Sequence, residues 1–115
     1  MAATNIMSLS KGGKWMAGSP IILNVFIEAA QGREEELAGM LKALVGATRS
    51  EPGCIGYELN ASQEKPGAFL FYEKFANQAA LDAHISSPHF QNFLKKRETS
   101  DPIASQSVTR WSAIA

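Results

Sequence analysis

The chain has 115 residues, of which 45% are hydrophobic and 19% are charged, with 11 basic and 11 acidic side chains. This length and composition are typical of one globular domain with a small core, and a net charge of zero argues against nucleic acid or an anionic membrane surface as the main partner. The single cysteine, Cys54, excludes an internal disulfide and a metal site built from several cysteines of one chain, and it is compatible with a cytoplasmic location.

The first 19 residues are rich in serine and glycine and show no periodicity. Lys11 and Lys14 are not followed by a continuous apolar segment, so a secretory signal is not expected. The chain also lacks a stretch that approaches the roughly 18 apolar residues of a membrane span. We therefore expect residues 1–19 to be a flexible arm or a remnant left by cloning, residues 20–115 to form the domain, and no membrane partner.

The first two elements have clear patterns. The run from Ile21 to Glu28 has one polar side chain before its last residue, that of Asn24, and is typical of a buried strand. A helix is predicted over 33–48, with three glutamates in its first turn and Arg49 at its end, as the helix dipole favours. Its apolar side chains recur at helical spacing: Leu37, Met40, Leu41, Leu44 and Val45.

Pro52 and Gly53 end this helix and lead into two strands, predicted over 54–60 and 68–75. The polar link between them ends in a Pro-Gly turn signal, so the two strands should form a hairpin. In the first strand, alternation places Ile55, Tyr57 and Leu59 on one face, and Cys54, Gly56 and Glu58 on the other.

Two short helices follow the hairpin. Asn77 is a good N-cap for a helix that ends near Ser86, with Ala80, Leu81, His84 and Ile85 on its inward face. Ser87 and Pro88 then predict the cap and first position of a helix that ends near Arg97. A last strand is predicted over 105–114, where alternation is weak.

The order of these elements is strand, helix, strand, strand, helix, short helix, strand. It is the split βαβ pattern of a ferredoxin-like α+β domain. One antiparallel sheet would carry the helices on one face, and a chain this short has no segment left to cover the other. We therefore expect a homodimer that forms through the open face of the sheet.

The central stretch resembles the antibiotic biosynthesis monooxygenase family, whose members include small quinol monooxygenases. The resemblance covers roughly residues 21–112. Its motifs are Glu51-Pro52-Gly53-Cys54, Gly56-Tyr57-Glu58, Tyr72-Glu73-Lys74-Phe75, Ala80-Leu81 with Ala83-His84, and Ser87-Pro88-His89-Phe90.

The resemblance implies a dimeric α+β barrel in which two sheets pack face to face. It also implies, as one main activity, attack on a reduced aromatic substrate by dioxygen without metal or flavin. Other members degrade haem, isomerise a phosphorylated signalling sugar product, or have no assigned activity. An oxygenase without a cofactor needs a base with a pKa near neutrality, groups that orient oxygen atoms, and an aromatic pocket that excludes water.

His84 is the candidate base, because a half-buried imidazole is neutral near pH 7 and accepts a proton. The alternative is a histidine at the edge of the core that bonds a backbone carbonyl. Glu73 is the candidate partner that orients His84, and its alternative is a charge at the strand end, paired with a cation. Glu51 is expected to belong to the turn.

The candidate substrate-binding residues surround this pair. The resemblance places Asn24 in the cavity, whereas a structural amide is the alternative. Tyr57 and Tyr72 could donate to a quinol oxygen or simply pack, and Phe75 would form an aromatic wall. His89 is expected at the start of a helix, on the surface or at the pocket mouth.

Metal and haem sites are not expected. The two histidines lack the i, i+4 spacing of a helical metal motif, and Pro88 separates them into different helices. In the haem-degrading branch, the resemblance implies a tryptophan at the third-strand position where this chain has Phe75. Haem degradation is therefore a minor alternative, and no cofactor is predicted.

Three functions remain open from the sequence. The first is a homodimeric, cofactor-independent monooxygenase of quinol-like or polycyclic aromatic substrates. The second is an isomerase of a small polar metabolite, favoured by a pocket lined with cations such as Lys74 or Arg110. The third is a binding or stress-response dimer without turnover, favoured by a collapsed cavity.

Overall fold

The computed structural model describes residues 19–115, so the arm predicted over 1–19 lies outside the described residues except for Ser19. The described part contains four strands and three helices, and no cis peptide bond. In chain order they are β1 (Ile21–Ala29), α2 (Glu34–Arg49), β2 (Cys54–Ala61), β3 (Ala68–Phe75), α3 (Gln78–Ser86), α4 (Pro88–Thr99) and β4 (Ile103–Trp111).

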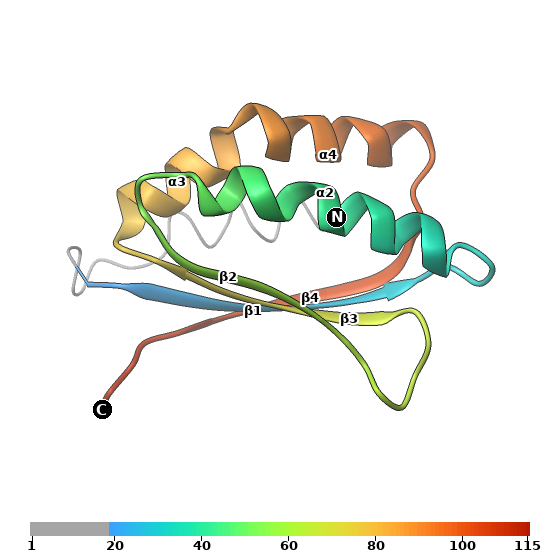
Figure 1. The fold of residues 1–115 in the computed structure, drawn as a ribbon, viewed down its shortest axis with the longest axis horizontal. Helices are drawn as coiled ribbons and strands as arrows, with labels where there is room; N and C mark the ends of the chain where they lie inside the picture. Colours follow the sequence, from blue (N-terminus) through green and yellow to red (C-terminus); the bar gives the residue numbers. More distant parts are fainter. Residues whose placement is uncertain (1–18) are drawn as a thin grey trace.

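The four strands form one antiparallel sheet in the order β2-β3-β1-β4. All three helices lie on one side of this sheet, and the chain end after β4 extends to the other side (Figure 1). The predicted ferredoxin-like α+β fold is therefore confirmed. No helix among residues 19–115 is both long enough and apolar enough to span a membrane.

The core lies between the sheet and the helices. Alternate residues of β1 are buried at Ile21, Leu23, Val25 and Ile27, because successive strand side chains point to opposite faces. The buried stripe of α2 packs onto this face through the residues that the helical spacing predicts: Leu37, Leu41 and Leu44 are buried, and Met40 and Val45 are partly buried against them.

The opposite face of the sheet carries large exposed side chains. Phe26, Tyr72 and Trp111 are 52%, 37% and 54% exposed. The register pairs Asn24 with Tyr72 and Ile22 with Trp111, so these residues share one face. Among residues 19–115 no helix covers this face, as the element order predicts (Figure 1).

Strand β2 differs from the simple alternation that the sequence predicts. Its register against β3 shifts between Cys54 and Gly56, where Cys54 pairs with Phe75 and Gly56 pairs with Lys74. This β-bulge inserts Ile55 between two paired residues and leaves it 56% exposed. The prediction that Ile55 shares the inward face of Tyr57 is therefore wrong, because alternation breaks at a bulge.

Candidate active site

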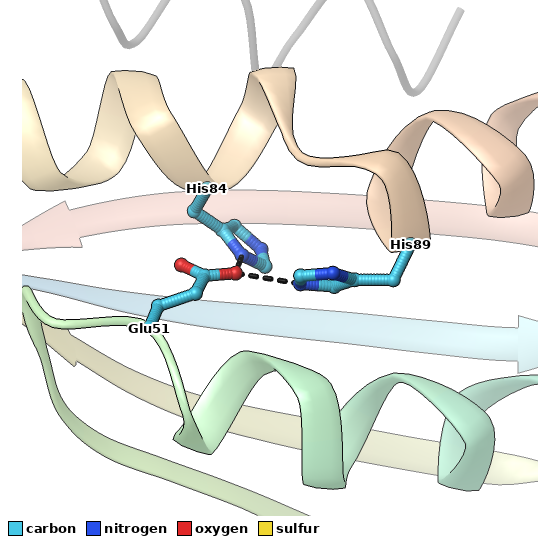
Figure 2. Close-up of side chains that lie close together, drawn as sticks. All are labelled: Glu51, His84 and His89. Carbon is cyan, nitrogen blue, oxygen red and sulfur yellow. Dashed lines mark hydrogen bonds and ion pairs between the residues drawn. The ribbon is translucent and has the colours of Figure 1, made fainter.

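Three side chains from three segments meet at one end of the core (Figure 2). Glu51 follows α2, His84 lies on α3, and His89 lies in the first turn of α4. The Oε2 atom of Glu51 is 2.9 Å from Nδ1 of His84 and 2.6 Å from Nε2 of His89. One carboxylate oxygen therefore binds both of the imidazole rings that the chain contains.

The turn after α2 fixes Glu51. Its N–H donates to the carbonyl of Thr48 at 3.0 Å, and its own carbonyl accepts from the N–H of Cys54 at 3.1 Å. Two residues on, a Cβ at Gly53 would overlap the Cβ of Ala80 on α3. Glycine at this position lets α3 approach the turn, and the approach brings Glu51 close to His84.

The ring of His84 is 2% exposed and has three aromatic neighbours. Ring-centre distances are 5.0 Å to Phe75, 5.0 Å to Phe90 and 5.6 Å to Tyr57. Apart from the Tyr57 hydroxyl, these three rings form an apolar wall that shields the His84 ring from water.

The break between α3 and α4 fixes His89. The Ser87 hydroxyl donates to the carbonyl of His84 at 2.6 Å and accepts from the N–H of Phe90 at 3.3 Å, as an N-cap does. The same oxygen is 3.1 Å from Nε2 of His89. Pro88 stands at the first helical position, where its ring is tolerated. The sharp turn that separates the two helices thus directs both histidines toward Glu51.

The protonation of His84 follows from its burial and its partner. Burial lowers the pKa of His84, and its hydrogen bond to Glu51 offsets only part of this effect. The ring is therefore neutral at pH 7. Because a carboxylate can only accept, Nδ1 carries the proton and Nε2 holds a lone pair. Among residues 19–115, Nε2 has no hydrogen-bond partner, so it is free to accept a proton from a ligand.

Glu73 is a second buried carboxyl group, only 5% exposed. Burial, together with the nearby charge of Glu51, raises its pKa to about 8. At pH 7 it is therefore mostly protonated and neutral. Burial and then the Glu73 charge also raise the pKa of Tyr57 well above its usual value, so the phenol stays protonated.

The predicted pairing of Glu73 with His84 differs from the contact that the structure shows. The carboxylate bonded to His84 is Glu51, and no hydrogen bond joins Glu73 to His84 in the described part of the chain. Glu51 does belong to the turn, but its side chain reaches the site as well. Glu73 lies beside Tyr57, its neighbour on β2, and the charge of Glu51 is one cause of its raised pKa.

The predicted substrate-binding residues fall into two groups. Tyr57 and Phe75 pack against the His84 ring. His89 is linked to His84 by Glu51, which both rings contact. Asn24 and Tyr72 are paired on the open face of the sheet, because they alternate with the buried residues of β1 and β3. Within one chain the structure does not bring these two residues together with His84.

Neither His84 nor Glu73 lines either of two hollows on the surface of residues 19–115. The larger, about 320 Å³, lies between α2 and the hairpin and is mostly apolar, with Lys42 in its lining. The smaller, about 70 Å³, lies between α2 and α4, with His89, Asn92 and Lys96 among its lining residues. His89 lines the smaller hollow and contacts Glu51, so it connects this hollow to the cluster.

Glu51 and Ser87 are the site residues that the sequence reasoning did not assign. A signal for Glu51 was present in the predicted topology. A hairpin returns the chain to its starting end, so the start of α3 must lie near the end of α2. The pairing of Cys54 with Phe75, and the bond from the N–H of Ala76 to the carbonyl of Gly53 at 2.8 Å, show this return.

Comparison with known proteins agrees with the fold and the motifs. The sequence model of the family described as antibiotic biosynthesis monooxygenase matches residues 20–96. The chain belongs to the antibiotic biosynthesis monooxygenase family. The matched segment includes Glu51, His84 and His89, so the cluster lies within the family domain.

Individual known proteins and solved structures are moderately similar to this chain. "Putative monooxygenase YcnE" of Bacillus subtilis is 30% identical over 66% of this chain and 80% of its own length. An uncharacterised protein of Synechocystis is 35% identical over 70% of this chain, but the match spans only 54% of that protein. A crystal structure from Pseudomonas aeruginosa has a TM-score of 0.80 at 29% identity, covering 86% of this chain and 98% of that one.

Proposed function

We propose that this protein is a cofactor-independent monooxygenase that acts on a quinol-like or polycyclic aromatic substrate with dioxygen. Membership of the antibiotic biosynthesis monooxygenase family supports the class of reaction. The observation that carries the proposal is the state of His84. Its ring is buried among aromatic side chains, its Nδ1–H donates to Glu51, and its Nε2 has no hydrogen-bond partner among residues 19–115.

In the proposed reaction, Nε2 of His84 removes a proton from the reduced substrate. The resulting anion is electron-rich and transfers electrons to dioxygen directly, so the substrate is its own reductant. One oxygen atom enters the product, and the other leaves as water with two hydrogens from the substrate. The aromatic walls exclude bulk water from the anion while dioxygen reacts.

Two carboxyl groups assist in this proposal. Glu51 stabilises the positive charge that forms on the His84 ring, as a carboxylate does beside a catalytic histidine. Glu73 holds a proton at pH 7 and is close enough to respond to the Glu51 charge, so it is the proposed proton reservoir. Asn24 and Tyr72 face away from His84, so in this proposal they act at the open sheet face and not on the reacting atoms.

The substrate enters beside His89. The hollow between α2 and α4 reaches His89, and its volume of about 70 Å³ is too small for a polycyclic substrate. Binding therefore requires the His89 ring to swing away from Glu51 and the aromatic walls to separate. His89 is 21% exposed in its side chain, more than Glu51 or His84, and it is the member of the cluster nearest to solvent.

The test is oxygen consumption by protein treated with EDTA, measured with anthrones and reduced naphthoquinones. We expect His84→Ala to lower the rate by about 100-fold or more, the range that a general base contributes. Asp82→Asn, an exposed change on the same helix, is the control and should keep the wild-type rate. Equal rates in wild type and His84→Ala would remove His84 as the base.

A non-catalytic binding dimer is the second candidate, because His84 is only 2% exposed and packs against three aromatic rings. It predicts that the wild-type protein consumes no oxygen with any substrate of this class. The isomerase has less support, since Lys74 pairs with Ile22 on the open face and Arg110 donates to Gln78 at 2.6 Å.

A further inference from the structure

We propose that Glu51, His84 and His89 also form a binding site for one divalent transition-metal ion, with Zn²⁺ as the best fit, and that the bound ion inhibits turnover. One donor atom from each residue lies within 4.8 Å of the other two. The donors come from the turn after α2, from α3 and from α4, so the fold itself assembles the set (Figure 2).

The distances between the donor atoms suit a metal site in which hydrogen bonds join the donors while no ion is bound. Oε2 of Glu51 is 2.9 Å and 2.6 Å from the two ring nitrogens. Donors around a tetrahedral Zn²⁺ at about 2.1 Å are about 3.4 Å apart. The two distances from Glu51 therefore need to widen by less than about 1 Å, while the two ring nitrogens, which lie within 4.8 Å of each other, need to approach to the same spacing.

The donor types select the ion. Two imidazole nitrogens and one carboxylate oxygen suit Zn²⁺ and Co²⁺, whereas Mg²⁺ and Ca²⁺ prefer oxygen donors alone. Three protein donors leave a fourth position for water. Burial strengthens the attraction, because the side chains of Glu51 and His84 are 14% and 2% exposed.

The surroundings already hold the donors in place. Ser87 accepts from the N–H of Phe90 and contacts Nε2 of His89, which limits how that ring turns. The other oxygen of Glu51, Oε1, is buried and has no hydrogen-bond partner among residues 19–115. A cation beside the carboxylate would compensate for this unpaired oxygen.

The inhibition follows from which nitrogen of His84 binds the ion. Coordination through Nδ1 requires the proton to move to Nε2, because a neutral imidazole carries one proton. The lone pair on Nε2 is then lost, and no base remains for the substrate. Binding of the ion stands on geometry alone, and only its effect on turnover rests on the proposed function.

Titration with Co²⁺ tests the binding, using full-length protein without a tag because the chain itself has only two histidines. We expect a visible absorption band that saturates at one Co²⁺ per chain and is displaced by Zn²⁺. Glu51→Gln and His89→Ala should each weaken binding by at least about tenfold. Glu35→Gln, which changes an exposed carboxylate on α2, is the matched control and should bind as wild type.

NMR of the histidine ring nitrogens in the wild-type protein also tests metal binding, and it needs no variant that could fail to fold. On addition of Zn²⁺, we expect the signals of His84 Nδ1 and His89 Nε2 to shift as liganded nitrogens do. Unchanged ring signals, the absence of a Co²⁺ band, or equal affinity in wild type and both donor variants would overturn the site.

Oxygen uptake then tests the inhibition separately. We expect Zn²⁺ to suppress uptake at the concentration that saturates the Co²⁺ site, and EDTA to restore it. Full activity at saturating Zn²⁺, or loss of activity in EDTA, would overturn the inhibitory role. If no substrate is oxidised, the proposed oxygenase fails, while the Co²⁺ and NMR results still decide the metal site.

Discussion

Glu51 and Glu73 are both carboxyl residues near the end of the core, but their surroundings differ. Glu51 accepts two imidazole N–H groups on one oxygen. Glu73 is buried, lies near the charge of Glu51 and has no hydrogen-bond partner among residues 19–115, so its charged form is disfavoured. The two groups are therefore suited to different tasks, one to hold charge beside the histidines and the other to hold a proton.

The first prediction concerns stability and pH. The pKa of Glu73 is about 8 in the folded chain and 4.5 in the unfolded chain, so the folded state retains a proton that the unfolded state releases. The free energy of unfolding should therefore fall as pH rises from about 4.5 to about 8, by a few kcal/mol, and change no further above that range. Urea unfolding at successive pH values measures this fall.

Glu73→Gln supplies the comparison. The amide has a similar shape and does not titrate, so the difference in the free energy of unfolding between wild type and variant reports the titration of Glu73. The lowered pKa of His84 makes stability rise with pH, and this effect is present in both proteins. Above pH 8 the variant should be the more stable protein. A pH profile that is the same in both proteins would contradict the raised pKa.

The second prediction links the two carboxyl groups. The charge of Glu51 is one of the two causes that raise the pKa of Glu73. Glu51→Gln removes this charge, so the pKa of Glu73 should fall, although burial keeps it above 4.5. Carbon-13 NMR of the Glu73 carboxyl, titrated in both proteins, measures the change. An unaltered pKa would mean that burial alone controls Glu73.

At the scale of elements, the turn after α2 and the start of α3 are packed in direct contact. The third prediction is that Gly53→Ala destabilises the protein by about 1–3 kcal/mol, because the new methyl group overlaps Ala80 and forces α3 outward. The same shift would separate His84 from Glu51, so activity should fall as well. Thermal unfolding and oxygen uptake measure the two effects.

Gly39→Ala is the matched control, since a Cβ there meets no atom within 4 Å and Gly39 lies inside α2. It should stabilise the protein by about 0.5–1 kcal/mol. Ala80→Gly combined with Gly53→Ala should recover much of the lost stability and activity by restoring the space. A double variant as impaired as Gly53→Ala would rule out this contact as the cause.

The sequence predicted the type and order of every element in residues 19–115, because each has a strong local signal. Examples are the apolar stripe of α2 and the capping residues Asn77 and Ser87. The predicted last strand, 105–114, was displaced from the observed Ile103–Trp111 because its alternation is weak. Burial of His84 also followed from helical spacing.

The partner of His84 did not follow from local patterns. Glu51 and His84 are 33 positions apart, and their contact depends on how the hairpin returns the chain and how closely α3 approaches Gly53. Glu73 was the more obvious carboxylate, because it lies among aromatic residues on a strand. Periodicity identifies which side chains point inward, but it does not identify which of them meet.

At the scale of the whole molecule, the fourth prediction concerns the open sheet face. Phe26 and Trp111 are more than half exposed on a face that no helix covers in the described part of the chain. We propose that two copies pack through this face. Phe26→Glu should therefore convert a dimer into monomers, because it places a charge in an apolar interface. Sedimentation equilibrium measures the mass.

Ala47→Glu is the control, because it adds the same charge to the exposed surface of α2 on the other side of the sheet. This variant should sediment like wild type. A monomeric wild-type protein, or a dimer that tolerates Phe26→Glu, would contradict assembly through the sheet.

Adjacent residues of strand β3 face two different environments, the open face of the sheet and the core. Tyr72 points to the open face, while Glu73 points to the core beside the histidine cluster. Because the side chains alternate, deleting one residue within this strand would exchange the two sets and place a phenol in the core and a carboxyl group outside. Strand β3 should therefore accept many replacements of its side chains, yet reject almost any change in its length.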